Sequence, residues 1–138
     1  MRAVLIVLIA SAAFAGFGCD SVFDKGCPDN FELWVEYQLF MGRSGPDGDI
    51  VDDAEWDAFL ADAVTPRFPD GLTVLDGNGQ WRGAEGQIQR EESKILIILT
   101  PIDDEQSQDL IEQVVTEYKT RFEQESVLKT VDKTCVAF

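Results

Sequence analysis

The chain has 138 residues, 45% hydrophobic and 27% charged, a composition typical of one globular domain rather than of a disordered tail or a multi-span membrane protein. Its 26 acidic residues outnumber 11 Lys and Arg residues, and the formal charge of −15 argues against a nucleic-acid partner. The chain has no histidine, which excludes Ser-His-Asp and Cys-His catalysis and the commonest ligand of zinc and haem. We expect neither a metal nor a cofactor.

Residues 1–19 have the pattern of an export signal peptide. Met1 and Arg2 provide a short positive start, and residues 3–17 are apolar or small apart from one serine. A stretch of about 15 such residues is typical of a signal-peptide core and is too short to cross a hydrocarbon layer, which takes about 20 helical residues.

The signal segment ends in Gly18-Cys19, which resembles the lipobox of bacterial lipoproteins, although Gly16 stands where that motif usually has leucine. We therefore expect acylation of Cys19 and a protein of the cell envelope that the lipid alone holds to a bacterial membrane. The alternative is cleavage after Ala15, which would give a soluble periplasmic or secreted protein.

The cysteine count supports the same compartment. Acylation of Cys19 would account for one of three cysteines and leave Cys27 and Cys135. In an oxidising compartment these two can form a disulfide, whose long loop corresponds to about 4.7 kcal/mol of stabilisation in the chain-entropy model. The alternative is two free thiols.

The rest of the chain reads as a tether over residues 20–30 and a single domain over residues 31–138. Residues 31–40 alternate between apolar and other side chains, the period of a half-buried strand. Residues 42–49 are rich in Gly, Asp and Pro and are expected to form a loop.

Two amphipathic helices are expected. Asp52 caps the first, Glu55 completes a capping box, and Pro66 ends the helix. Pro101 and the acidic residues 103–105 begin the second, where negative charge favours the positive end of the helix dipole. The apolar faces comprise Trp56, Phe59, Leu60, Ala63 and Val64 in the first helix and Leu110, Ile111, Val114, Val115, Tyr118 and Phe122 in the second.

Three more strands complete the pattern. Residues 71–82 predict a strand that the glycine-containing segment 76–79 interrupts, and residues 88–100 predict the returning strand. The centre of the latter, Ile95–Leu99, is apolar without alternation, so we expect both of its faces to be covered. Residues 126–138 predict the last strand.

The order β-α-β-β-α-β predicts an α+β, ferredoxin-like split βαβ fold, with both helices on one face of a four-stranded antiparallel sheet. Right-handed crossovers give the strand order 4-1-3-2. The start of the first strand then meets the end of the fourth, where Cys27 and Cys135 lie. Topology and cysteine count thus predict the same disulfide.

The sheet face without helices could be solvated, could form a homodimer, or could floor a small-molecule pocket. The first strand places Trp34, Glu36 and Phe40 on it, and the aromatic residues favour the homodimer. Three arginines stand out because the chain is so acidic: Arg67, Arg82 and Arg90. A guanidinium group could stack on Trp81 or bind the carboxylate of a ligand, or it could simply pair with nearby acidic residues.

The stretch from Thr65-Pro-Arg-Phe-Pro-Asp-Gly to Gly79-Gln-Trp-Arg resembles a bacterial family known as domain of unknown function three-five-seven-four, whose members are short exported proteins or lipoproteins. The segments Arg90-Glu-x-Ser-Lys and Cys135-Val-x-Phe match as well. The resemblance implies an α+β fold and export, but no reaction. Its motif residues that backbone geometry does not explain are Gln80, Trp81, Arg82, Arg90 and Glu91.

Two functions follow from these observations. The first is a non-catalytic envelope module that binds a small molecule or an envelope protein through the hairpin that carries Trp81 and Arg82. The second is a cofactor-independent enzyme of the dimeric ferredoxin-like type, with Glu91 or Glu36 as the base and Arg82 or Arg90 as the electrostatic stabiliser.

Overall fold

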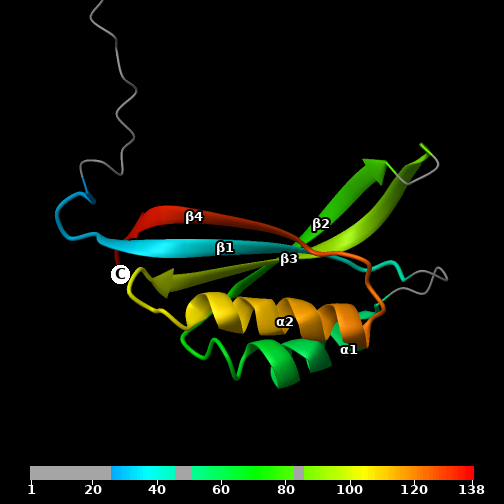
Figure 1. Cartoon of the computed structure of the whole chain (residues 1–138), viewed down its shortest axis with the longest axis horizontal. Helices are drawn as coiled ribbons and strands as arrows, with labels where there is room; N and C mark the ends of the chain where they lie inside the picture. The colour runs from blue at the N-terminus through cyan, green and yellow to red at the C-terminus, as the bar shows by residue number, and fades with distance from the viewer. Residues whose placement is uncertain (1–25, 46–50, 83–85) are drawn as a thin grey trace, which may run out of the picture.

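The computed structural model describes residues 26–45, 51–82 and 86–138, so the expected signal peptide, Cys19 and the first part of the expected tether lie outside it. The elements follow one another in the order predicted from the sequence (Figure 1). They are β1 (Glu32–Gly42), α1 (Asp53–Phe59), η2 (Leu60–Val64), β2 (Thr73–Arg82), β3 (Ile88–Pro101), α2 (Ser107–Arg121) and β4 (Leu128–Val136).

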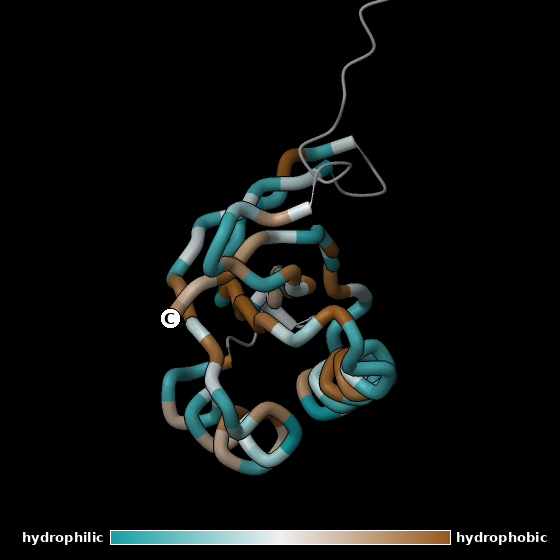
Figure 2. The backbone as a smooth tube through the Cα atoms, turned by 90° about the vertical axis from the view of Figure 1, so that its left-hand side faces the viewer, coloured by the Kyte–Doolittle hydropathy of each residue, from teal (hydrophilic) through white to brown (hydrophobic). Residues whose placement is uncertain are grey.

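The four strands form one sheet in the order β2-β3-β1-β4, and each neighbouring pair is antiparallel. The helices lie together on one side of this sheet (Figures 1 and 2). This is the ferredoxin-like α+β arrangement, and the predicted strand order is confirmed.

The core lies between the sheet and the helices. Leu39, Leu96 and Ile98 contribute from the sheet, and all three are fully buried. Tyr118 of α2 is buried too, and its hydroxyl donates a hydrogen bond of 2.9 Å to the carbonyl oxygen of Gly42. Burial raises the pKa of Tyr118, so the hydroxyl keeps its proton for this bond.

The first helix begins as predicted. The Asp52 carboxylate accepts a hydrogen bond of 2.8 Å from the Glu55 backbone N–H, and the Glu55 carboxylate accepts one of 3.0 Å from the Asp52 N–H. After Phe59 the chain continues as the wider π-turn η2, in which the Thr65 N–H bonds to the carbonyl of Leu60.

Two predicted boundaries are wrong. Strand β2 is not interrupted at residues 76–79, because Asp76, Gly77, Asn78 and Gly79 all keep their register with β3. Helix α2 begins at Ser107 rather than near Pro101, because β3 runs to Pro101 and turns with i to i+3 hydrogen bonds follow it.

The Cys27–Cys135 disulfide is present, with the two Cα atoms 5.6 Å apart. It joins the segment before β1 to the end of β4, at the end of the sheet predicted from the topology. Just after Cys27, the Phe31 N–H bonds to the Pro28 carbonyl, so this part of the expected tether is a closed turn. In the described residues, no helix is both long enough and apolar enough to cross a membrane.

Candidate functional site

The sheet has one face without helices, and the strand registers define which residues lie on it. Successive residues of a strand point to opposite faces, and paired residues of neighbouring strands share a face. Leu39 and Met41 are buried under the helices, so the even-numbered residues of β1 point the other way. We call this side the open face. It comprises Glu32, Trp34, Glu36, Gln38, Phe40 and Gly42 of β1, the odd-numbered residues 73–81 of β2 and 89–101 of β3, and the even-numbered residues 128–136 of β4.

The centre of the open face is apolar. On β3 the helices cover Leu96 and Ile98, whereas the neighbouring Leu99 on the open face is 37% exposed. Both faces of β3 are therefore apolar, as the sequence shows, but the single chain covers only one of them. Across the open face, Leu75 and Leu128 are 48% and 64% exposed, and the half-buried side chains include Trp34, Phe40, Ile95 and Ile97.

The charges on the open face are all negative. Its ionisable side chains are acidic, whereas every Lys and Arg of the four strands occupies a position on the helix side. Glu36 and Asp132 stand directly opposite each other on β1 and β4, and such like-charged pairs are destabilising. The Gln38 side-chain amide donates a hydrogen bond of 2.6 Å to the Glu36 carboxylate. This bond orients the carboxylate. The acidic residues are Glu32, Glu36, Glu91 and Asp132.

Glu91 lies over the backbone of Gly42. A Cβ atom at residue 42 would lie 2.5 Å from a Glu91 carboxylate oxygen, so the glycine provides the space that this carboxylate occupies. Trp81, 45% exposed, stands diagonally across from Glu91 on β2, because the register pairs Gly79 with Glu91 and Trp81 with Gln89. This end of the open face therefore combines a carboxylate with an exposed indole.

The other side of the β2–β3 hairpin carries the arginines. Gln80 pairs with Arg90 in the register, and the Arg90 Nε donates a hydrogen bond of 3.5 Å to the Gln80 side-chain oxygen. A groove of about 360 Å³ lies at these residues, and Asn78 and Glu92 help to line it. Arg82 and Arg90 are exposed, and neither forms an ion pair with a described residue.

Arg67 lies elsewhere, in a groove of about 540 Å³ beside α2. Its guanidinium forms an ion pair of 3.2 Å with Glu117, a hydrogen bond of 3.4 Å to Gln113 and a further bond to the Ala63 carbonyl. Arg67 is thus engaged in fastening η2 to α2. The predicted binding residues are therefore divided among three surfaces: Arg67 beside α2, Gln80, Arg82 and Arg90 on the helix side of the hairpin, and Glu36, Trp81 and Glu91 on the open face.

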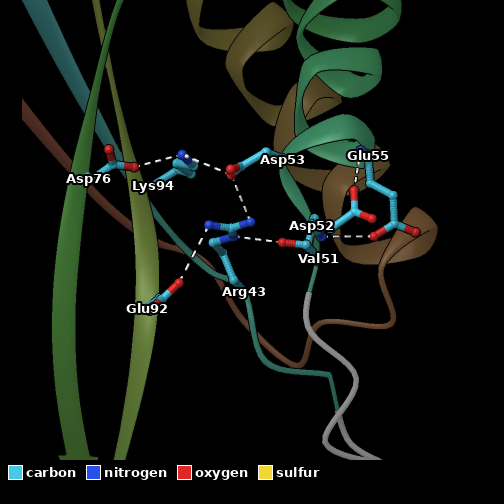
Figure 3. A network of polar contacts seen from close by, with 8 residues as sticks. All are labelled: Arg43, Val51, Asp52, Asp53, Glu55, Asp76, Glu92 and Lys94. Atoms are coloured by element: carbon cyan, nitrogen blue, oxygen red, sulfur yellow. Dashed lines mark hydrogen bonds and ion pairs between the residues drawn. The ribbon is translucent and has the colours of Figure 1, made fainter.

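The sequence analysis missed an ionic network around Arg43 (Figure 3). The Arg43 side chain is only 11% exposed; its Nε donates a hydrogen bond of 2.6 Å to the Val51 carbonyl, and its Nη atoms contact Asp53 at 3.0 Å and Glu92 at 3.5 Å. Lys94 extends the network to Asp76. No motif marks Arg43, because its contacts join a loop, a helix start and a strand that are distant in the sequence.

Lys94 and Asp76 shift each other's pKa. The Lys94 Nζ lies 2.6 Å from the Asp76 carboxylate, and this hydrogen bond, reinforced by the lysine's charge, lowers the pKa of Asp76. The same hydrogen bond raises the pKa of Lys94. Asp76 pairs with Lys94 in the register of β2 and β3, so this contact joins the two strands on the helix side of the sheet.

The chain also matches a known protein family over most of its length. The model of the family described as "Protein of unknown function (DUF3574)" matches residues 36–138. The chain belongs to this family. The match covers all of β2, β3 and β4 and most of β1, and it confirms the resemblance drawn from the sequence motifs. No curated protein sequence matches the chain.

Two solved structures have a similar fold. A phage SAM lyase in complex with S-methyl-5′-thioadenosine shares 16% identity, with a TM-score of 0.60 over 76% of this chain and 90% of that one. CutA from Synechococcus elongatus PCC7942 shares 10% identity, with a TM-score of 0.52 over 83% of this chain and 88% of that one. At these identities the likeness establishes the fold alone.

Proposed function

We propose that this DUF3574 protein is an exported, lipid-anchored binding module of the cell envelope, and that it binds through the open face of its sheet. The partner that this face fits is a protein segment that presents basic and apolar side chains together. The observation that carries the proposal is the combination of exposed apolar residues with charge of a single sign on the open face.

The exposed apolar area supports binding because its burial releases free energy, at about 25 cal/mol per Å². Leu75, Leu99 and Leu128 lie on three different strands, so the apolar area crosses the whole sheet. Contiguous apolar patches of this kind mark interaction sites on soluble domains.

The acidic residues support a basic partner. Glu36 and Asp132 repel each other in the isolated chain, and a cation placed between them would remove that cost. A two-fold homodimer of two open faces would instead bring together the Glu36–Asp132 pairs of both copies, with no strand cation beside them. The homodimer is therefore the less favoured occupant, and it is one outcome of the test below.

Direct binding tests the open face. The probe is a ten-residue peptide of alternating Lys and Trp, with a peptide of alternating Lys and Ser as the equal-charge control, and the binding constant is measured by fluorescence anisotropy. We expect the Lys/Trp peptide to bind at least about tenfold more tightly, a difference of about 1.4 kcal/mol. Native mass spectrometry of the same protein reports any homodimer, which would point to the other occupant.

Charge variants locate the peptide site. The double substitution Glu36→Gln/Asp132→Asn should weaken binding of the Lys/Trp peptide about tenfold. The control Asp57→Asn/Glu105→Gln removes the same net charge from exposed helix-side positions and should leave binding within about twofold. Equal losses in both variants would show that only overall acidity attracts the peptide, and would refute the open-face site.

Metabolic labelling tests the proposed anchor. Cells that express the full chain are fed an alkyne fatty acid, and the protein is recovered and tested for label. We expect label on the wild type and none on Cys19→Ser. An unlabelled wild type that is nevertheless cleaved near Ala15 would indicate a soluble exported protein instead.

A second candidate function is an enzyme that acts on a sulfonium compound. The fold likeness to a SAM lyase, together with an acidic face that bears Trp34 and Trp81, favours it, because a sulfonium ion is a cation that carboxylates and indoles attract. In one chain the proposed bases, Glu36 and Glu91, and the proposed stabilisers, Arg82 and Arg90, point to opposite faces. Incubation with S-adenosylmethionine, followed by chromatography for S-methyl-5′-thioadenosine, tests this candidate. If both Glu36→Gln and Glu91→Gln form the product at the wild-type rate, neither glutamate is the catalytic base.

A further inference from the structure

We propose that the basic partner of the open face is this chain's own β2–β3 hairpin, supplied by a second copy. Arg82 and Arg90 of one copy would lie on the open face of the next, near Glu36 and Asp132. The inference rests on the open face being the binding surface, as proposed above, and it names the occupant of that surface.

The β2–β3 hairpin presents an exposed surface on its helix-side face that can contact a second copy. It extends beyond the helices and bends away from them (Figure 1). Arg82 and Arg90, on its helix-side face, are exposed. Arg82 and Ile88 are paired in the register there, and Ile88 is 56% exposed. Arg90 stands diagonally across from Arg82 on the same face. This surface therefore presents two guanidinium groups beside an apolar side chain.

The two surfaces complement each other within one sequence. In a chain of charge −15, two adjacent arginines without an ion pair to any described residue are unusual, and their mutual repulsion is unfavourable. The open face has the opposite arrangement, with Glu36 and Asp132 beside apolar residues and no strand cation. Bringing the two surfaces together would relieve both repulsions and bury apolar area on each side.

The position of the surfaces determines the kind of assembly. The arginines lie on the helix side of the sheet and the acidic residues on the open side, so a copy that docks its hairpin on a neighbour leaves its own open face directed away from that neighbour. Two copies therefore cannot satisfy both contacts reciprocally. The contact is head-to-tail, and repeating it gives an assembly of three or more copies, which closes as a ring where the rotation between neighbours permits.

Native mass spectrometry of the full chain, purified from the cell envelope in detergent, tests the assembly. We expect the wild type to contain three or more copies. Arg82→Glu/Arg90→Glu should be monomeric, and so should Glu36→Lys/Asp132→Lys, because each places like charges in the interface. The quadruple variant, which carries both pairs of changes in one chain, should assemble again, and this recovery would show that the four changes are compatible with the fold and act through charge pairing.

Mixing the two double variants gives a second readout. Each supplies the surface that the other needs, so the mixture should form assemblies in which the two variants alternate, with an even number of copies. A monomeric or two-copy wild type, or a quadruple variant that stays monomeric, would overturn the proposal. If the wild type is monomeric but still binds the Lys/Trp peptide at Glu36 and Asp132, the open-face function stands and its occupant is another protein.

Discussion

At the scale of single residues, Arg43 shows how one side chain can join elements that are distant in sequence. Its guanidinium donates to the Val51 carbonyl and contacts Asp53 and Glu92, so it links the end of β1, the start of α1 and β3. An arginine suits this position because its planar group presents several donors in fixed directions. Sequence patterns did not reveal it, since its partners become neighbours only in the folded chain.

Replacing this arginine should be costly. We expect Arg43→Ala to lower the free energy of unfolding by about 2 kcal/mol, chiefly because the buried Val51 carbonyl loses its donor, with a smaller contribution from the two exposed acids. Urea denaturation followed by tryptophan fluorescence measures the change. The exposed control Lys119→Ala should stay within about 0.5 kcal/mol of the wild type. Equal stability of Arg43→Ala and the control would mean that the network contributes nothing.

At the scale of elements, the sequence predicted the number, type and order of strands and helices, but misjudged β2. The Asp-Gly-Asn-Gly segment has turn chemistry, yet it stays in the strand because β3 pairs with it throughout and Lys94 holds Asp76 from across the ladder. The predicted interruption of β2 also left the direction of its later side chains undefined. Side-chain direction alternates only along a continuous strand, so the faces of Trp81 and Arg82 could not be related to the face of Leu75 before the register was known.

The Asp76–Lys94 pair should give β2 a characteristic pH dependence. The pKa of Asp76 is lowered below its ordinary value of 3.8, so its stabilising effect is complete above that value and is lost as pH falls through the folded-state pKa. Urea unfolding of the wild type and Asp76→Asn should therefore differ by a constant amount from pH 7 to about pH 5. The difference should then close below about pH 4. Asp57→Asn, at an exposed site, serves as the control, and a difference that persists at pH 2 would contradict this role for the ion pair.

At the scale of the whole molecule, the strand order and the disulfide were predictable together, because the split βαβ topology brings the start of β1 beside the end of β4. The separation of acidic residues on one sheet face from basic residues on the other could not be predicted from the sequence. It depends on the parity of every strand relative to the core, and parity is fixed by the exact register of β2 and β4 on their neighbours. The candidate residues could therefore be named from the sequence but could not be assigned to one sheet face or the other.

The disulfide should contribute a large part of the stability. The two cysteines are 108 positions apart in the sequence. Removing the disulfide in Cys27→Ser/Cys135→Ser should lower the free energy of unfolding by about 4 kcal/mol. Urea denaturation under non-reducing conditions measures the loss. Dithiothreitol should destabilise the wild type by a similar amount and leave the double variant unchanged. If reductant affected both proteins alike, its action would have another cause.

The place of the disulfide also limits how high the domain can stand above a membrane. If Cys19 carries the lipid, only eight peptide units separate it from Cys27, and a segment of that length spans at most about 28 Å. The cross-link lies at the end of the sheet opposite the β2–β3 tip (Figure 1). So short a connection would keep the cross-linked end of the domain within that distance of the headgroups.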